Sequence, residues 1–259
     1  MDLALDASVG QEYSSPTQIA RVLSEDWVAR QAYCLGCGEG GLHRTKSNTQ
    51  ALDFTCKSCS APYEFKASKR VFRNRILDGE YHAFLDAVSS LRIPNLLLLN
   101  YSLVEMVVTQ LMAIPREALS RSSVIPRRPL GPRAMRHGWQ GCVIDLSVLP
   151  PSGRVAVILE GIARPQSVVL EEWRLLDFLR QEGRATREWL PDVISSVRRI
   201  ASEEFSLAEV YQDVPLLRDL HPSNRNIQPK IRQQLQILVA QGMLERVRPG
   251  IYRKTPRIG

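Results

Sequence analysis

Two C-x-x-C pairs constrain this chain more than any other feature of its sequence. The first pair is Cys34 and Cys37, the second is Cys56 and Cys59, and 18 residues separate them. Each C-x-x-C turn directs two thiolates at one point, so two such turns can complete a tetrahedral four-sulfur zinc site. A closed site of this kind leaves no position for substrate, so we expect the zinc to be structural.

The fifth cysteine, Cys142, lies in the apolar stretch CVIDLSVL and is expected to be a buried core residue.

The N-terminal stretch MDLALDASVGQEYSS is acidic and does not resemble a secretory signal. The apolar runs at 96–99 and 155–159 are far too short to span a membrane. We therefore expect a cytoplasmic protein with no membrane partner and no disulfide framework, monomeric in solution.

The positive charge of the chain gathers in two runs. The formal net charge is +7. Residues 121–139 contain five arginines and no acid, and residues 225–259 contain eight basic residues against one acid, Glu245. Either run alone is compatible with a solvated charged face, but two separate runs favour a polyanionic partner such as nucleic acid.

Hydrophobic periodicity predicts an α/β region followed by a small α+β region. The first is expected to contain a helix over 15–33, a hairpin with strands at 52–55 and 63–67, a helix over 79–91, and strands at 96–100, 104–114, 142–149 and 154–160. Helical patterns follow at 168–181 and 187–201. From Phe205 the pattern indicates helices at 207–212, 216–220 and 227–243 and two strands around Pro249-Gly250, the order of a winged helix.

Asp53, Glu64 and Lys66 frame the second cysteine pair. If that pair is the tip of a hairpin, the strand period of two directs Glu64 and Lys66 to one face, which Asp53 can reach from the partner strand. Two carboxylates can bind Mg²⁺, and a lysine can polarise or help deprotonate an attacking water. A hairpin with charged residues facing solvent has the same pattern. The helix before the trio, and the helix and apolar strand after it, favour the catalytic interpretation.

This helix–strand–strand–helix–strand order, with D…ExK on the hairpin, resembles the PD-(D/E)xK nuclease superfamily. The runs SEDWV, LDF before the second cysteine pair, RRPLGPRAMRHGWQGC, IDLS and KIRQQLQIL are similar to the DpnI-type restriction endonucleases, also called the Dam-replacing family. The similarity extends from about Leu23 to Lys254. Leu52 stands where the superfamily name has proline.

The resemblance implies a Mg²⁺-dependent endonuclease that cuts duplex DNA at GATC sites carrying N6-methyladenine. It implies a PD-(D/E)xK nuclease domain with structural zinc over residues 1–183 and a winged-helix DNA-binding domain over 184–259, both of which read the methylated site. Asp53, Glu64 and Lys66 match the catalytic positions, with the two acids holding Mg²⁺. The four paired cysteines match the Zn²⁺ ligands.

Candidate DNA-binding residues lie in three places. The third helix of the winged helix should enter the major groove, where Asn and Gln can pair with adenine and Arg with guanine. Its candidates are Asn224, Arg225, Asn226, Gln228, Lys230, Arg232, Gln233 and Gln236. The wing offers phosphate contacts from Arg246, Arg248, Arg253 and Lys254. The Pro/Gly-rich loop before Cys142 offers Arg127, Arg128, Arg133, Arg136, His137 and Trp139.

The chemistry of N6-methyladenine restricts which side chains can recognise it. An N6-methyl group removes one donor hydrogen from adenine and adds an apolar group, so a methyl reader needs an apolar contact beside its polar ones.

The apolar residues Ile227, Ile231 and Leu235 are spaced four apart and are expected to form the core face of their helix. Trp139 either stacks on a distorted base step or anchors its loop in the core.

Two other functions fit the same sequence. A non-catalytic regulator with a zinc ribbon and a winged helix would share the cysteines, the basic tail and the helices. Only Asp53, Glu64 and Lys66 distinguish the nuclease from this regulator, because a regulator has no use for these three residues on one hairpin face. A nuclease that nicks or cuts at a different modified base also remains open.

Overall fold

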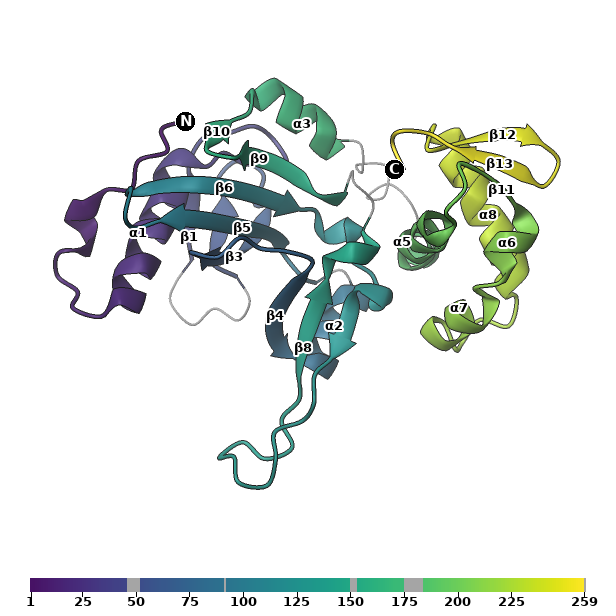
Figure 1. Cartoon of the computed structure of the whole chain (residues 1–259), viewed down its shortest axis with the longest axis horizontal. Coiled ribbons are helices and arrows are strands. Elements are labelled where there is room, and N and C mark those ends of the chain that lie inside the picture. The colour runs from purple at the N-terminus through teal and green to yellow at the C-terminus, as the bar shows by residue number, and fades with distance from the viewer. Residues whose placement is uncertain (46–51, 91, 150–152, 175–183, 259) are drawn as a thin grey trace. The chain divides into compact units, whose positions relative to one another are not determined.

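The computed structural model describes residues 1–45, 52–90, 92–149, 153–174 and 184–258 (Figure 1). Contacts divide the chain into two compact units. The first contains Met1–Arg73, Leu91–Arg116 and Arg154–Asp177, and the second contains Asn74–Ser90, Glu117–Gly153 and Phe178–Gly259. The predicted domain boundary at 183/184 stays a prediction; it adjoins residues 175–183, which lie outside the described residues, as does part of the helical pattern predicted over 168–181.

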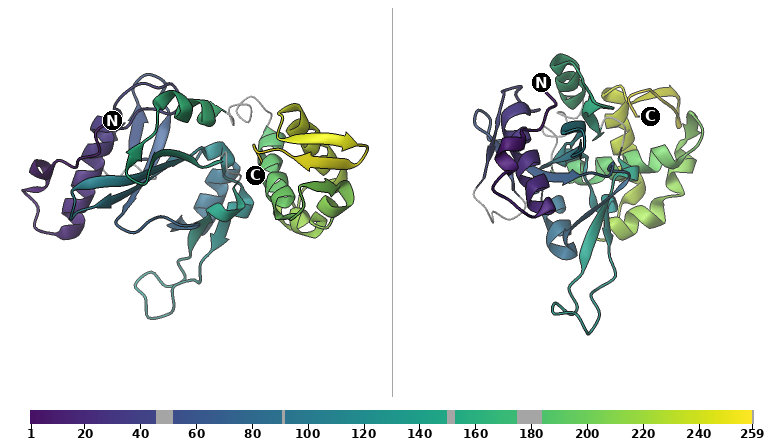
Figure 2. Two further views of the ribbon diagram at one scale, coloured as in Figure 1. Left: turned by 45° about the horizontal axis from the view of Figure 1, so that its top comes forward. Right: turned by 60° about the vertical axis from the view of Figure 1, so that its left-hand side comes forward.

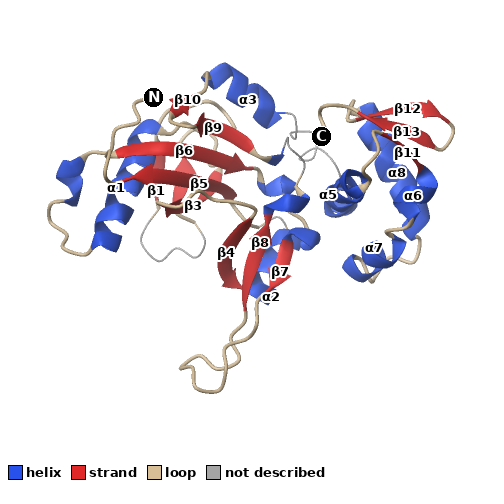
Figure 3. Ribbon diagram, viewed as in Figure 1, coloured by secondary structure: helices blue, strands red, loops and turns tan. Residues whose placement is uncertain are grey.

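The first unit is built on a mixed sheet in the order β1-β2-β3-β5-β6-β9-β10, whose longest strands are red arrows in Figure 3. β3 and β5 run parallel, and the other neighbours are antiparallel. β5 lies in the middle of this sheet, and its leucines 96–99 are at most 2% exposed. The strands are β1 (Leu42–Arg44), β2 (Phe54–Cys56), β3 (Pro62–Ser68), β5 (Asn95–Ser102), β6 (Val107–Ile114), β9 (Val155–Leu159) and β10 (Ile162–Ala163).

Two helices help to bury one face of this sheet. Helix α1 (Pro16–Gln31) begins with proline in its first turn, where the missing N–H costs no helical hydrogen bond. Its Trp27 joins the core that contains Tyr63 of β3. Helix α3 (Gln166–Arg174) adds Trp173 to the same core. A short 3₁₀ helix, η1 (Ala7–Gly10), precedes α1.

The second unit contains an antiparallel sheet in the order β4-β8-β7, with helix α2 (Tyr81–Ser89) beside it. The predicted helix over 79–91 begins at Tyr81, because the Glu80 side chain caps it by accepting from the Ala83 N–H. The strand before it was not predicted. The strands are β4 (Arg75–Glu80), β7 (Val124–Pro126) and β8 (Gly141–Asp145), and the 3₁₀ helices near them are η2 (Arg116–Ala118), η3 (Arg121–Ser123) and η4 (Leu146–Val148).

The C-terminal part, green to yellow in Figure 2, has the predicted winged-helix order with one additional strand, β11 (labelled in Figure 1). Its sheet runs β11-β13-β12, and Ser206 with Glu209 forms a capping box at the start of α6. Ile231 and Leu235 are fully buried, which confirms the predicted core face of α8. The elements are α5 (Arg184–Arg199), β11 (Glu204–Ser206), α6 (Leu207–Tyr211), α7 (Val214–Leu220), α8 (Ile227–Ala240), β12 (Leu244–Arg248) and β13 (Ile251–Lys254).

A buried hydrogen-bond chain, here called the latch, ties η3, α5 and the end of α7 together. It consists of Ser122, Asp192 and His221. The Asp192 carboxylate is 1% exposed, accepts from the Ser122 hydroxyl at 2.5 Å, and lies 2.8 Å from His221 Nε2. The His221 ring stacks on Trp189 with centroids 4.0 Å apart.

We predict that His221→Ala lowers the free energy of unfolding by about 3 kcal/mol, because it leaves a buried carboxylate without its imidazole partner. Urea denaturation followed by circular dichroism measures this loss. His82→Ala is the matched control, since His82 is an exposed histidine on α2. Equal free energies of unfolding for the two variants would contradict a stabilising role of the latch.

Among the described residues, no helix combines the length and the apolar content needed to cross a bilayer.

Candidate functional site

The four paired cysteines meet at one point. Their sulfur atoms all lie within 4.8 Å of one another, and the Cys34–Cys59 and Cys37–Cys56 sulfur pairs are each 3.5 Å apart. Zinc–sulfur bonds of about 2.3 Å in a tetrahedron place neighbouring sulfurs roughly 3.8 Å apart. The cluster therefore fits one zinc ion, as the spacing predicted.

The two cysteine turns have the same local construction. In each, the residue after the second cysteine has a positive φ, +83° at Gly38 and +57° at Ser60. Its N–H donates to the carbonyl of the first cysteine, from Gly38 to Cys34 at 2.7 Å and from Ser60 to Cys56 at 3.0 Å. These tight turns bring each pair of sulfurs together.

Neighbouring donors support negative charge on the Cys56 sulfur, whereas burial and the adjacent thiols raise the pKa of Cys59. Burial would raise the pKa of the Cys56 thiol, but the N–H groups of Cys59 and Ser58 and the adjacent thiols lower it to about 7. The hydroxyl of Tyr63 lies 3.2 Å from the Cys34 sulfur. Thiolates are the form that binds zinc, so these contacts suit a metal site.

Glu64 and Lys66 are in direct contact on β3. Lys66 Nζ lies 2.7 Å from Glu64 Oε1, so both side chains project from the same face of the strand, as the period of two predicted. The Lys66 side chain is 21% exposed and the Glu64 side chain is 9% exposed. The strand thus holds a largely buried charged pair.

Asp53 reaches the same segment of β3 through a different contact. The β2–β3 ladder pairs Phe54 with Tyr63, and Asp53 lies just before it. The Asp53 carboxylate accepts from the N–H of Phe65, at 2.8 Å. Phe65 lies between the other two members of the trio in the sequence. Glu64 and Lys66 therefore contact each other directly, whereas Asp53 is hydrogen-bonded to the backbone of the residue between them.

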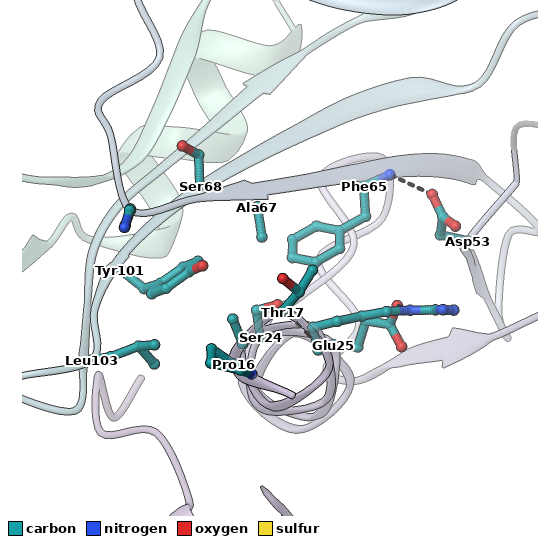
Figure 4. A pocket seen from close by; sticks show the side chains of 13 residues that line it. Pro16, Thr17, Ser24, Glu25, Asp53, Phe65, Ala67, Ser68, Tyr101 and Leu103 are labelled. Carbon is teal, nitrogen blue, oxygen red and sulfur yellow. Dashed lines mark hydrogen bonds and ion pairs between the residues drawn. The ribbon is translucent and has the colours of Figure 1, made fainter. Parts of the chain in front are cut away.

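A cavity of about 580 Å³ adjoins Asp53 on the α1 side of β3 (Figure 4). The side chains of Phe65 and Ala67 line it, and these alternate with Glu64 and Lys66 along the strand, so the cavity lies on the opposite strand face. Asp53 lines this cavity as well.

Two residues of α1 in this cavity were not singled out from the sequence. Arg21 Nε donates to Glu25 Oε1 at 2.7 Å, and Arg44 contacts the second oxygen of Glu25. The Glu25 carboxylate, through this hydrogen bond and its charge, raises the pKa of Arg21, with a smaller contribution from Asp53. The signal that could have identified this pair in the sequence is Glu25, an acid in the run SEDWV that falls on the mostly apolar side of the helix.

The predicted base-reading residues lie on α8 and on the three residues just before it, 224–226. Arg225, Asn226, Gln228, Arg232, Gln233 and Gln236 are exposed, whereas Asn224 and Lys230 are half-buried. Arg232 donates to the hydroxyl of Tyr211 at 2.5 Å, with its guanidinium 5.8 Å from that ring's centroid. Tyr211 therefore holds the arginine side chain in one orientation.

The wing residues divide into two groups. Arg246 and Arg248 are exposed on β12. Arg253 instead pairs with Glu204 at 3.2 Å and Glu245 at 3.4 Å, and Lys254 donates to the carbonyl of Ile200. Arg246 and Arg248 are available to a ligand, whereas Arg253 links the outer strands of the wing sheet and Lys254 bonds to the segment just after α5.

The loop over residues 127–140 is a hairpin extension of β7 and β8, here called the finger (Figure 1). Backbone bonds close its base, from Arg127 N to Gly141 O and from Leu130 N to Trp139 O, both 2.9 Å. Its predicted DNA-binding side chains are exposed apart from the half-buried tryptophan: Arg127, Arg128, Arg133, Arg136 and His137.

Trp139 packs within the finger. The Arg136 guanidinium lies 5.1 Å from its ring centroid. A Cβ at residue 141 would come within 2.9 Å of the ring, so only glycine fits beneath it. Cys142, the next residue, is fully buried in β8, as predicted.

Comparison with known protein families assigns both parts of the chain. Residues 1–182 match the sequence model described as the Dam-replacing family, and residues 185–254 match the model described as the Dam-replacing HTH domain. The second match covers the helices and wing described above.

Proposed function

Because the chain belongs to the Dam-replacing family and carries that family's helix-turn-helix domain, we propose that it is a Mg²⁺-dependent endonuclease that cuts duplex DNA at GATC sites carrying N6-methyladenine. At the level of the family it is a methylation-dependent restriction endonuclease. The proposal adds the target sequence, the methylated base and the metal. It assigns cleavage to a nuclease domain over residues 1–183 and part of the recognition to the winged helix over 184–259.

The observation that carries the proposal is the Glu64–Lys66 contact beside Asp53. A buried charged pair costs free energy of desolvation, so a strand that keeps one needs a reason beyond stability. A protein that only bound DNA would gain nothing from it. This favours the nuclease over the regulator, whose other features are the same.

In the proposed mechanism Asp53 and Glu64 would hold Mg²⁺, because carboxylate oxygens are the hard ligands that this ion prefers. Bound Mg²⁺ stabilises the charge that grows on the phosphate. Lys66, fixed at 2.7 Å from Glu64, would polarise the attacking water or help to remove its proton. The Asp53 carboxylate accepts from the Phe65 N–H at 2.8 Å, which fixes its position beside β3.

We further propose that α8 enters the major groove with its exposed Asn, Gln and Arg side chains. Arg246 and Arg248 would bind phosphates beside it, as would the arginines of the finger. The protein would be a monomer in solution, and its substrate would be double-stranded DNA.

The first test is the digestion of one plasmid prepared with and without adenine methylation at GATC, each with Mg²⁺ and with a chelator. We expect cleavage only of the methylated plasmid and only with Mg²⁺. Gel electrophoresis of the products reads out the result. Preferential binding of methylated DNA without cleavage would leave a regulator, and cleavage of both plasmids would refute the methylation requirement.

A further inference from the structure

A group of positive side chains lies directly after strand β3 and was not singled out from the sequence. Residues 65–77 contain five basic residues and no acid. Three of the five, Lys69, Arg70 and Arg73, lie in the segment 69–73, here called the basic loop. All three are exposed, and none of them pairs with an acid among the described residues. The loop therefore presents three cations to solvent.

The buried amide of Asn100 holds the backbone of the basic loop in one conformation. Asn100 lies on β5 and is 2% exposed. Its Nδ2 donates to the carbonyls of Ser68, at 3.0 Å, and Arg70, at 2.6 Å, and its Oδ1 accepts from the Phe72 N–H at 3.3 Å. A loop that is already ordered loses little conformational entropy when its side chains bind a ligand. This suits a preformed binding surface better than a flexible connection.

The basic loop lies beside the residues of the proposed active site. Lys69 follows Lys66 by three residues, which is about 10 Å along an extended chain. Lys69 also lines the same cavity as Asp53. Successive phosphates of one DNA strand are about 3.4 Å apart along the helix axis. A cation at this distance therefore reaches a phosphate about three nucleotides from one held at Lys66.

Charge and position together identify the phosphate backbone of DNA as the partner of this loop. Lysine and arginine bind phosphates without regard to base sequence. An acidic protein surface is the other partner that three cations could take. The loop adjoins the groups that we propose act on a phosphodiester, which favours DNA.

We propose that Lys69, Arg70 and Arg73 bind the phosphates that flank the one to be cut, and so position the DNA backbone against β3. The inference rests on the proposed function, since it names a further binding surface beside the same active site. The contact is independent of base sequence and of methylation. These are positioning residues that take no part in the chemical step.

The test measures how the affinity for an unmethylated duplex depends on salt, in chelator so that nothing is cut. Each phosphate bound by a cation contributes about 0.9 to the slope of log affinity against log salt concentration. Arg70→Ala/Arg73→Ala should therefore reduce the steepness of this slope by about 1.8 and weaken binding roughly tenfold. Arg70→Lys/Arg73→Lys should restore most of the slope, because lysine keeps the charge. The control Lys57→Ala/Arg174→Ala removes the same net charge from two other exposed side chains.

A second measurement locates the contact on the DNA. In a set of methylated duplexes, a neutral methylphosphonate replaces one phosphate at a time. We expect the wild type to bind more weakly when the replaced phosphate lies within about three nucleotides of the cut. Arg70→Ala/Arg73→Ala should no longer respond to replacement at those positions. A variant that responds there as the wild type does would overturn the inference.

The outcomes separate this inference from the proposed function. An unchanged salt slope in Arg70→Ala/Arg73→Ala would overturn the role of the basic loop in DNA binding and leave an acidic protein as its partner. An equal fall in the Lys57→Ala/Arg174→Ala control would also overturn it, because the effect would then be one of net charge. A wild type that cuts neither plasmid, with the expected fall in slope, would refute the proposed function and support the loop as a DNA contact.

Discussion

Replacement of Lys66 by alanine is expected to abolish DNA cleavage, with a fall in rate of roughly a thousandfold or more, while methylated DNA is still bound. The ammonium group lies 2.7 Å from Glu64 Oε1, on the strand that we propose carries the catalytic groups. Its loss would remove the group proposed to act on the attacking water. The surfaces that we propose bind DNA, on α8 and the finger, would remain.

Single-turnover cleavage of a methylated GATC duplex measures this effect, and a binding assay in chelator shows that the variant is folded. Alanine also leaves the Glu64 carboxylate, 7% exposed, without its ammonium partner. Lys66→Met therefore serves as a second variant, since it fills similar space without the charge. Lys57→Ala is the control, an exposed lysine on the same hairpin. Normal cleavage by either Lys66 variant would show that the proposed active site is wrong.

The structure also indicates a sharper substitution for Asp53 than alanine. In Asp53→Asn the side-chain oxygen can still accept from the Phe65 N–H, so the local geometry is kept and the negative charge is removed. Because the charge is what would hold Mg²⁺, this variant should lose cleavage as completely as Asp53→Ala.

The parts of the fold that sequence predicted well are those fixed by local pattern. The spacing of the cysteines was sufficient to predict their cluster, because each turn closes within a few residues. The core face of α8 followed from residues four apart, and the burial of β5 followed from its unbroken apolar run. The same local period placed Glu64 and Lys66 on one face.

The parts that sequence did not predict depend on distant partners. Strand β4 pairs with β8, which lies about 60 residues later in the chain, and its residues RILDGE have no clear alternation. β1 is three residues long within a polar stretch. Whether the Trp139 ring was free or packed depended on the backbone of Gly141 beneath it. None of these contacts leaves a periodic signal.

Removal of zinc is expected to unfold much of the first unit, because two of the four sulfur ligands belong to its core. Cys34 and Cys56 are 0% and 3% exposed and join the same cluster as Trp27 and Tyr63. Structural zinc sites hold about 10 kcal/mol or more of apparent binding free energy in small domains. We therefore expect Cys56→Ser to lower the free energy of unfolding by at least about 5 kcal/mol.

Thermal denaturation before and after a tight chelator measures the zinc effect directly. Cys142→Ala is the control for loss of a buried cysteine outside the cluster, and it should show only the modest cost of trimming a core side chain. Unchanged melting after complete removal of bound metal would contradict a structural zinc.

The second cysteine turn and the proposed catalytic residues occupy one hairpin, β2–β3, so loss of zinc should disturb the proposed Mg²⁺ site, whereas loss of Mg²⁺ should not disturb the zinc site. The second cysteine pair lies between Asp53 at one end of the hairpin and Glu64 and Lys66 on the other strand. Loss of zinc should therefore abolish cleavage even in excess Mg²⁺, and only added zinc should restore it. Loss of Mg²⁺ should stop cleavage without changing the melting temperature by more than a few degrees, because the Phe65 N–H already positions Asp53. Restoration of cleavage to zinc-free protein by Mg²⁺ alone would refute this coupling.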